Sequence, residues 1–377
     1  MPPVDRPTHQ RLKAATPGGI LAIDLNALIS NYRMLAQCAA PALCAAAVKA
    51  DAYGLGLAPV ARALDAAGCR IFLVADVAEG ARLRAILADA EIHVLTGPTR
   101  GDEADFEAYG LMPVLNDLSQ IDLWAAYARH RQTRLAAVLH LDTGMNRLGL
   151  TPTDAGRLSG ELTRLDGIGL AWVMSHLACA DTVGHEMNAR QLALFNDLRG
   201  ALPAASATIA NSGGIFLGPA YHLDMVRPGI SLYGGQPHSG NPNPMAQVVH
   251  LQGRILQVRR VDSPMTVGYG ATHGITGPSR LATVGVGYAD GYPRALSNRG
   301  FGAIGGVKIP VVGRVSMDLI TLDVSRIPPE QCRPGTLVDL IGGAISLDEL
   351  AAAAGSISYE LLTGLGQRLH RVYTGGA

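Results

Sequence analysis

Short apolar runs recur through the first two thirds of the sequence, and this repetition constrains the fold more than any other feature. The runs lie at 44–48, 71–75, 92–95, 112–115, 136–141, 169–174, 207–210 and 223–226. Most are separated by longer segments with helical spacing of apolar residues, for example at 77–87, 117–129, 153–165 and 186–199. Because a helix between two strands returns the chain to a parallel neighbour, eight such units over roughly 200 residues predict a (β/α)8 TIM barrel.

The last part of the chain has a different pattern. Short β-rich runs at 248–258, 280–286, 307–312, 319–324 and 337–341 are separated by Gly and Pro, with few helical segments between them. Turn residues at 234–244 precede these runs. We therefore predict an N-terminal arm at 1–19, a barrel at 20–240 and a C-terminal mainly-β domain at 241–377. The apolar segment 20–23 is a candidate extra strand of that domain.

Composition excludes several classes of function. The 377 residues are 48 % hydrophobic and 16 % charged, which suits a sizeable core rather than a disordered chain. The net charge is zero, so nothing indicates a nucleic-acid partner or an anionic membrane surface. The longest apolar run, 39–48, is far shorter than the ~20 residues of a membrane span.

The five cysteines are scattered and show no CxxC spacing. We expect them to be buried free thiols in a reducing compartment, and we expect no metal site. The first 16 residues are polar and contain proline, without the apolar core of an export signal. The cytoplasm is therefore the expected compartment.

The predicted barrel draws attention to the ends of its strands, because the active sites of such barrels lie at the carboxyl ends. Lys49 directly follows the first strand, whereas Arg147, His176, Ser212 and Arg227 follow the fifth to the eighth. Taken alone, Lys49 would be an exposed lysine at a strand end. At a barrel rim, burial lowers the pKa of an amine, and a neutral amine condenses with carbonyl groups.

Eight motifs carry more specific information. They are AVKADAYGLG at 47–56, LDTGMNRLG at 141–149, SHLA at 175–178, NSGG at 211–214, MVRPGISLYG at 225–234, GYGAT at 268–272, GYADGYPR at 287–294 and GRVSMD at 313–318. In order and spacing they resemble the motifs of the alanine racemase family, over residues 20–373. The resemblance implies a barrel followed by a C-terminal β domain, with pyridoxal 5'-phosphate as cofactor. It also implies an enzyme that interconverts L-alanine and D-alanine.

The resemblance assigns two catalytic bases. Lys49 anchors the cofactor and acts on one face of the substrate, while Tyr269, contributed by a second subunit, acts on the other. An ordinary tyrosine, with a pKa of ~10, is a poor base at neutral pH, so its surroundings must favour the phenolate. The resemblance places His176 and Arg227 behind the tyrosine, with Arg227 also facing the pyridine nitrogen of the cofactor. A site built from two chains implies a homodimer.

The remaining implied residues bind cofactor or substrate. The cofactor side, largely the phosphate seat, comprises Tyr53, Arg147, Asn211, Ser212, Gly229, Ile230 and Tyr359. The substrate side comprises Arg147, Met317, Asp318 and Tyr288. Met317 and Asp318 come from the partner chain, and Tyr288 narrows the access path. Without the motifs, each of these would be an ordinary loop residue or a packed tyrosine.

One position departs from the family pattern. Many members carry a lysine two residues before the Asp of the DTGM motif, and its carbamate holds the arginine of that motif. Here the position is His140. We hypothesise that Arg147 is oriented instead by the neutral imidazole of His140 or by a bound anion such as chloride.

Three alternatives remain. A racemase of broader specificity, or one for serine, would use the same catalytic residues. A barrel decarboxylase shares the cofactor, but the GYGAT segment around Tyr269 argues against it. A cofactor-binding protein without activity resembles the barrel alone, and the C-terminal extension argues against it. The eight motifs do not distinguish a racemase that supplies D-alanine from one that degrades it.

Overall fold

The computed structural model describes residues 18–376, and these residues form two compact units. One unit comprises residues 25–246 together with Gly376, and the other comprises residues 18–24 and 247–375. Most of the predicted N-terminal arm, residues 1–17, lies outside the described part of the chain. Within residues 18–376, no helix has the length and apolar character needed to cross a membrane.

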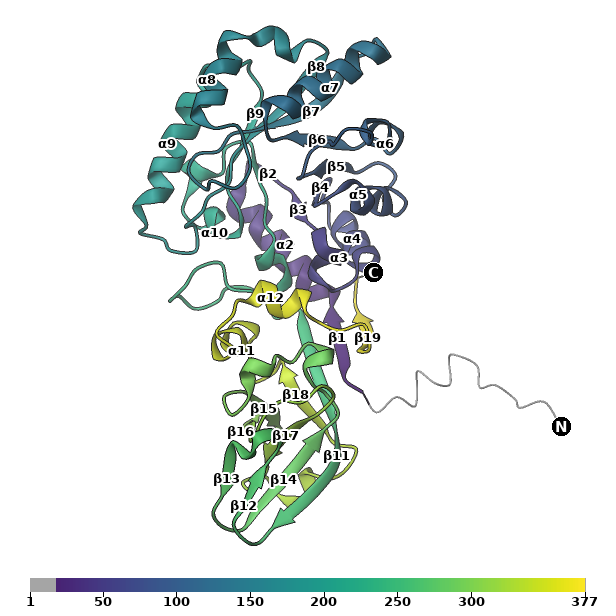
Figure 1. The fold of residues 1–377 in the computed structure, drawn as a ribbon, viewed down its shortest axis with the longest axis vertical. Coiled ribbons are helices and arrows are strands. Elements are labelled where there is room, and N and C mark those ends of the chain that lie inside the picture. Colours follow the sequence, from purple (N-terminus) through teal and green to yellow (C-terminus); the bar gives the residue numbers. More distant parts are fainter. Residues whose placement is uncertain (1–17, 377) are drawn as a thin grey trace, which may run out of the picture. The chain divides into compact units, whose positions relative to one another are not determined.

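The larger unit is a parallel barrel (Figure 1). Its strands are β2 (Leu43–Cys44), β3 (Ala46–Ala47), β4 (Ile71–Val74), β5 (Glu91–Val94), β6 (Met112–Leu115), β7 (Leu135–His140), β8 (Ile168–Met174), β9 (Ser206–Thr208) and β10 (Met225–Val226). Neighbours pair in parallel around the sheet, and its two ends are β2 and β3. Since only Ala45 separates β2 from β3, they are two parts of the first barrel strand, and the sheet closes through it. The predicted (β/α)8 barrel is confirmed.

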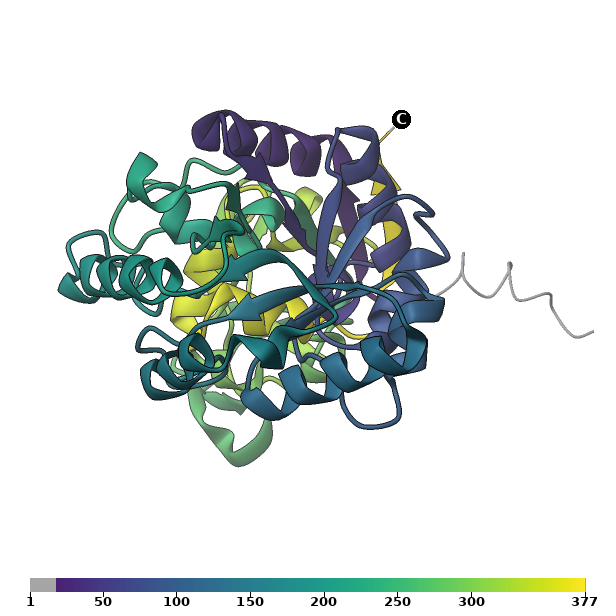
Figure 2. The ribbon, with the colours of Figure 1, turned by 90° about the horizontal axis from the view of Figure 1, so that it is seen from above.

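Helices lie around the outside of these strands (Figures 1 and 2). They are α2 (Leu25–Ala39), α3 (Lys49–Tyr53), α4 (Leu57–Ala66), α5 (Val77–Arg84), α6 (Glu103–Ala108), α7 (Leu118–Arg131), α8 (Pro152–Gly160), α9 (Glu186–Gly200) and α10 (Ser212–Ile215). Asp76, Asp117 and Thr151 cap α5, α7 and α8 through their side-chain oxygens, as these residue types commonly do. The helix predicted at 153–165 ends at Gly160, and a 3-10 turn, Leu162–Leu165, follows, because glycine and the non-helical Glu161 interrupt it.

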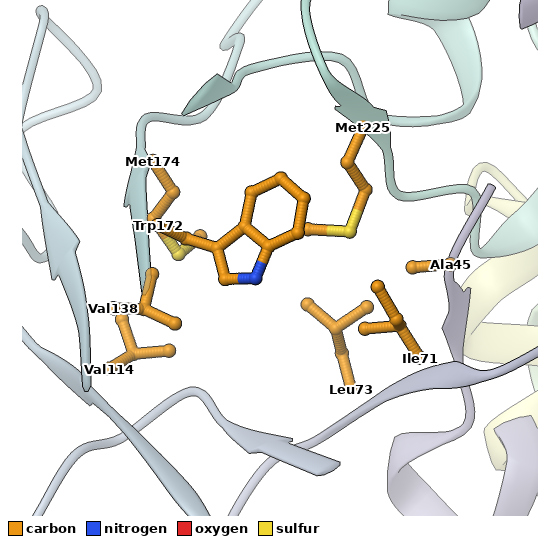
Figure 3. Close-up of a cluster of buried hydrophobic side chains, with 8 residues drawn as sticks. All are labelled: Ala45, Ile71, Leu73, Val114, Val138, Trp172, Met174 and Met225. Atoms are coloured by element: carbon orange, nitrogen blue, oxygen red, sulfur yellow. The ribbon is translucent and has the colours of Figure 1, made fainter. Parts of the chain in front are cut away.

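The barrel interior is a packed apolar core rather than a pore. Figure 3 shows the Trp172 ring in the middle of this cluster, with its neighbours directed toward it. The cluster comprises Ala45, Ile71, Leu73, Val114, Val138, Trp172, Met174 and Met225. The indole N–H donates to Glu91 Oε1 at 3.0 Å, so its polar atom is satisfied. Fully burying one Val, Leu, Ile or Met side chain of this cluster contributes about 1.5–3 kcal/mol. The packed core therefore stabilises the strands whose carboxyl ends form the barrel rim.

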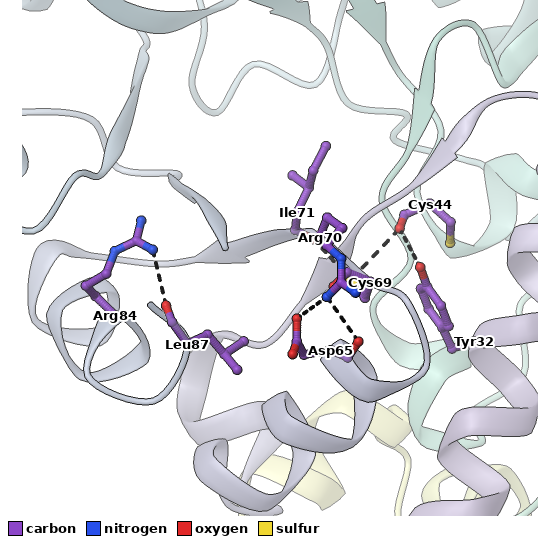
Figure 4. A network of polar contacts seen from close by, with 8 residues as sticks. All are labelled: Tyr32, Cys44, Asp65, Cys69, Arg70, Ile71, Arg84 and Leu87. Atoms are coloured by element: carbon purple, nitrogen blue, oxygen red, sulfur yellow. Dashed lines mark hydrogen bonds and ion pairs between the residues drawn. The ribbon is translucent and has the colours of Figure 1, made fainter. Parts of the chain in front are cut away.

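The cysteines differ in burial. Cys69 and Cys332 are buried, but Cys44 and Cys179 are partly exposed and Cys38 is exposed. The prediction that all five are buried is therefore wrong: Cys38 lies outside the buried stripe of α2, which follows helical spacing. Figure 4 shows Cys69 near the first barrel strand, where its thiol donates to the Ile71 carbonyl at 3.3 Å. Burial raises the pKa of Cys69 to about 12, so this thiol is unreactive.

The smaller unit is mainly β. Its strands are β1 (Ile20–Asp24), β11 (Val249–Val261), β12 (Met265–Val267), β13 (His273–Ile275), β14 (Ser279–Val284), β15 (Phe301–Ile304), β16 (Val307–Pro310), β17 (Ile320–Asp323), β18 (Leu337–Ile341) and β19 (His370–Thr374). The main sheet has the order β16-β15-β18-β11-β1-β19, with β14 and β17 continuing from β11. β1 is antiparallel to β11 and parallel to β19. Two short helices, α11 (Leu347–Ala353) and α12 (Ser358–Thr363), complete the unit.

Candidate active site

Lys49 stands at the end of the first barrel strand and begins an unusual turn. The four following residues, 50–53, all have φ between 54° and 56°. None is glycine, and the left-handed conformation costs roughly 1–2 kcal/mol for each such residue. Strain of this kind concentrates at functional sites, where surrounding contacts must hold it. Burial and the neighbouring Arg147 lower the pKa of the Lys49 amine, and Glu79 opposes this shift.

Arg227 follows β10 and is buried, with 5 % of its surface exposed. Its Nη2 donates to the Ser175 carbonyl at 2.6 Å, and its Nη1 donates to Thr208 Oγ1. Within residues 18–376 it has no carboxylate partner, so it is not the structural salt bridge that its residue type alone would indicate. Burial lowers the pKa of Arg227 to about 10. The group therefore stays charged at neutral pH, and of its five N–H donors these two bonds leave others for a ligand.

Arg147 lies on a tightly closed loop after β7. Asp142 Oδ1 accepts hydrogen bonds from the N–H groups of Gly144 and Met145, both at 2.9 Å. An isolated bridge between Leu141 and Leu150 closes the base of the loop. The Arg147 side chain is exposed at this rim. The aspartate of the DTGM motif therefore shapes the loop rather than facing the ligand.

His140, at the end of β7, binds a residue that the sequence did not indicate. Its Nδ1 lies 2.7 Å from Asn116 Oδ1. Asn116 Nδ2 donates to the carbonyls of Leu95 and Val114, so Oδ1 is the acceptor and the proton is on His140 Nδ1. Burial, followed by the charge of Arg227, lowers the pKa of His140 to about 4, so the ring is neutral.

These contacts test the hypothesis that the His140 imidazole orients Arg147. Its guanidinium makes no hydrogen bond to His140 among the described residues: the imidazole is buried and donates its Nδ1–H to Asn116, whereas the arginine lies exposed on its loop. Direct orientation of Arg147 by His140 is therefore wrong. Orientation by a bound anion stays a prediction.

His176 follows β8 and is half-buried. Burial, followed by the charge of Arg227, lowers its pKa well below the ordinary value. Its loop is held by Gln191 of α9, which donates to the His176 carbonyl at 2.9 Å and to Thr143 Oγ1 at 3.2 Å. Gln191 also accepts from the Ala178 N–H at 2.9 Å. Nothing in the sequence signals this glutamine, because it lies on a helix outside every motif.

A compact polar seat lies where β9 and β10 end. Ser212 Oγ accepts from the N–H groups of Gly229 at 2.9 Å and Ser231 at 3.3 Å. Ser231 Oγ is buried and has no hydrogen-bond partner within residues 18–376. A Cβ on Gly229 would lie 2.2 Å from Tyr53 Oη, so only glycine fits beside that phenol. Convergent N–H and O–H groups with an unsatisfied hydroxyl suit a phosphate dianion.

Two other implied residues adjoin this seat. Asn211 is the N-cap of α10, and its Oδ1 accepts from the Gly214 N–H at 3.0 Å. Ile230 is buried at the start of the 3-10 turn Ile230–Tyr233. These two residues shape the backbone around Ser212, and neither side chain brings a charge to the seat.

The other implied residues belong to the smaller unit and are exposed there. Tyr269 begins the 3-10 turn Tyr269–Ala271 and is 72 % exposed, and Tyr359 of α12 is 42 % exposed. Tyr288 and Met317 lie on loops that pair, since the Tyr288 N–H donates to the Ser316 carbonyl at 3.0 Å.

Asp318 lies on the same paired loops as Met317. Its Oδ1 accepts from Arg368 Nη1 at 2.7 Å, and the same guanidinium binds Asp290 through two bonds of 3.0 Å. Arg368 was not indicated by any motif. The structure thus brings Tyr288, Met317 and Asp318 together in one unit.

Comparisons with known proteins identify the family. Residues 23–237 match the family model "Alanine racemase, N-terminal domain", and residues 248–373 match "Alanine racemase, C-terminal domain". An alanine racemase of Rhodospirillum rubrum is 51 % identical over 358 residues, covering 94 % of this chain and 96 % of the relative. A catabolic alanine racemase of Agrobacterium fabrum is 48 % identical over 371 residues, covering 98 % and 96 %. The structure of alanine racemase from Bartonella henselae with covalently bound pyridoxal phosphate superposes with a TM-score of 0.91 at 39 % identity, covering 95 % of this chain and 99 % of that one.

Proposed function

Since this chain belongs to the alanine racemase family, we propose that Lys49 and Tyr269 are the two bases with which it interconverts L-alanine and D-alanine. Members of this family are isomerases that use pyridoxal 5'-phosphate. When bound, this cofactor supplies an electron sink for the electron pair left on the substrate carbon after deprotonation. The observation that carries the proposal is Lys49, a half-buried amine with a lowered pKa on a strained turn at the barrel rim.

The barrel residues suit the cofactor by their donor chemistry. Ser212 Oγ, with the N–H groups of Gly229 and Ser231 around it, would hold the phosphate. Arg227 would donate a hydrogen bond to the pyridine nitrogen and keep its own proton, because its pKa of about 10 lies above neutral pH. By leaving the pyridine unprotonated, Arg227 would limit electron withdrawal by the ring and, with it, side reactions such as transamination.

Proton transfer requires a free amine and a tyrosine on the opposite face of the substrate. Burial and Arg147 lower the pKa of Lys49, which favours the neutral form of Nζ that can accept a proton. Tyr269 is 72 % exposed in the single chain, and a base of this kind works best away from water. We therefore propose a homodimer in which each site combines Lys49 of one protomer with Tyr269 of the other.

Substrate and compartment complete the proposal. Arg147, with Met317 and Asp318 of the partner protomer, would meet the amino-acid carboxylate, and Tyr288 would narrow the access path. The free cysteines support a reducing compartment, and we propose the cytoplasm.

Racemisation by Tyr269→Phe tests the assignment of the second base. We expect activity to fall by about 10²–10⁴-fold, because a positioned proton-transfer group is lost, while the visible absorbance of the bound cofactor survives. Tyr109→Phe is the matched control, since Tyr109 is also an exposed tyrosine but belongs to no motif. Full activity of Tyr269→Phe would refute the assignment.

Two further measurements address the dimer and the substrate. Co-expression of Lys49→Ala and Tyr269→Phe chains should restore about a quarter of the wild-type activity, because half of the randomly formed dimers contain one intact site. Absence of any recovery would contradict a shared site. A panel of L-amino acids that includes serine separates an alanine racemase from one of broader specificity, since a single hydroxyl changes binding little in an apolar pocket.

A further inference from the structure

We propose that Glu79 is the positioning residue for Lys49: its buried carboxylate holds the left-handed turn that carries the lysine against the end of strand β4. This inference rests on the proposed role of Lys49 as cofactor anchor and base. Glu79 belongs to α5, 30 positions after the lysine in the sequence, and to none of the eight motifs.

The turn needs an external support. Ala50, Asp51, Ala52 and Tyr53 each adopt φ values that disfavour residues with a Cβ. Such a run persists only where surrounding contacts determine it. Without support, the backbone after Lys49 would relax toward ordinary φ values, and the amine would move with it.

Glu79 supplies contacts at the first residue of the turn. Its Oε1 accepts from the Ala50 N–H at 2.7 Å, and its Oε2 accepts from the Ala75 N–H, next to β4, at 2.9 Å. The carboxylate therefore joins the residue after Lys49 to the neighbouring barrel strand. From the second residue of the turn, Asp51 Oδ1 accepts from the Leu57 N–H at 2.8 Å and ties the turn to α4.

The chemistry of this position requires a carboxylate. Two N–H groups face the side chain, and a glutamine offers one acceptor oxygen where glutamate offers two. Glu79 is 9 % exposed and makes no ion pair with Lys or Arg within residues 18–376. A buried carboxylate without such a partner is unfavourable for packing alone. Its negative charge acts on the amine, since it opposes the lowering of the Lys49 pKa by burial and by Arg147.

Isotope effects distinguish a positioning role from a general loss of structure. The two enantiomers have equal free energy, so any variant lowers kcat/KM equally in both directions. A misplaced Lys49, however, slows proton removal from one enantiomer and proton delivery to the other. For Glu79→Gln we expect kcat to fall about 10- to 100-fold. The α-deuterium isotope effect should rise in the direction in which Lys49 removes the proton and fall in the other.

Two reference variants make this comparison decisive. Tyr269→Phe identifies the direction in which Tyr269 removes the proton. Asp76→Ala removes the N-cap of the same helix, whose Oδ1 accepts from the Glu79 N–H at 2.9 Å, but keeps the carboxylate. Asp76→Ala should lower the free energy of unfolding, but it should not shift the α-deuterium isotope effects of the two directions in opposite senses. Isotope effects that move the same way in both directions for Glu79→Gln would overturn the proposal.

The small number of lysines permits a second measurement that does not depend on turnover. The chain contains only Lys13, Lys49 and Lys308, so labelling lysine with ¹³C at Cε gives three NMR signals in the cofactor-free full-length chain. The Lys49 signal is identified by its loss in Lys49→Ala. Glu79→Gln should lower the pKa of Lys49 and leave the other two lysines unchanged. An unchanged Lys49 titration would also overturn the proposal.

Failure of this inference and failure of the proposed function give different results. If Lys49→Ala retains cofactor absorbance and racemisation, the role of Lys49 itself is wrong. If Lys49→Ala is inactive but Glu79→Gln behaves like the wild type in both measurements, only the role of Glu79 is wrong. The NMR measurement also shows whether Glu79→Gln is folded, because the Lys308 signal reports its ion pair with Glu349.

Discussion

Replacing Gly229 with alanine tests whether close packing at the barrel rim builds the cofactor seat. A Cβ there would lie 2.2 Å from Tyr53 Oη and 3.1 Å from Tyr53 Cζ. Ordinary contacts begin at 3.4 Å, so the phenol must retreat by about 1.2 Å, the difference between 3.4 and 2.2 Å. It cannot move freely, because the Tyr53 ring stacks on Tyr233 at 4.6 Å, and Tyr233 Oη donates to the Ala47 carbonyl at 2.8 Å.

The expected cost follows from this crowding. Overpacking in a well-packed interior destabilises by about 1–3 kcal/mol, so the free energy of unfolding should fall by that amount. The Gly229 N–H, which donates to Ser212 Oγ, moves with the strained backbone. If the same strain opposes cofactor binding, the dissociation constant should rise roughly 5- to 150-fold, since 1.4 kcal/mol is a factor of ten. Urea denaturation and absorbance titration with pyridoxal phosphate measure the two quantities.

Two variants control this experiment. Gly156→Ala makes the same chemical change on α8, where no atom lies within 4 Å, and should stabilise by up to about 1 kcal/mol. Adding Tyr53→Phe to Gly229→Ala removes the Oη that the new Cβ meets and should restore most of the lost stability. The reasoning is refuted if Gly229→Ala equals the wild type in both quantities, or if Tyr53→Phe restores nothing.

Two further predictions concern pH and the second base. The pKa of His140 is lowered from 6.5 to about 4 in the folded chain. As pH drops, the unfolded chain therefore protonates His140 before the folded chain does. The free energy of unfolding should fall by up to about 3 kcal/mol between pH 6.5 and pH 4. Denaturation at several pH values should show a smaller fall for His140→Gln, and an equal fall would contradict this. Asn298 Oδ1 accepts from the Gly313 N–H at 2.6 Å, and its Nδ2 donates to Thr272 Oγ1 at 3.3 Å, beside the Tyr269 turn. Asn298→Ala should therefore lower kcat by about tenfold and change the two α-deuterium isotope effects in the opposite sense to Glu79→Gln.

The barrel was predictable because its pattern is local and repeated. Each predicted apolar run from 44–48 to 223–226 overlaps a strand, and the packed interior agrees with the apolar residues of those runs. The break of the first strand at Ala45 was not predictable, because it depends on pairing with two different neighbours, β10 and β4. In the smaller unit, β12, β13, β15 and β19 were missed, since short strands rich in glycine or at a sheet edge carry little periodic signal.

The rim residues were predictable for a similar reason. Lys49, Arg147, His176, Ser212 and Arg227 each follow a barrel strand in the structure, because the carboxyl ends of parallel strands share one edge. The partner of His140 was not predictable. Asn116 lies 24 positions away, and its amide orientation depends on the carbonyls of Leu95 and Val114.

The sequence by itself determined the order of strands and helices, the barrel, and which residues stand at the strand ends, because these depend on periodicity and neighbouring residues. Only the tertiary structure decided what holds those residues in place. The contact between Ala50 and Glu79 spans 29 positions, and that between Gln191 and Thr143 spans 48. Such hydrogen bonds form only when the barrel has closed and brought distant backbone and side-chain groups within about 3 Å, a distance that no sequence pattern encodes.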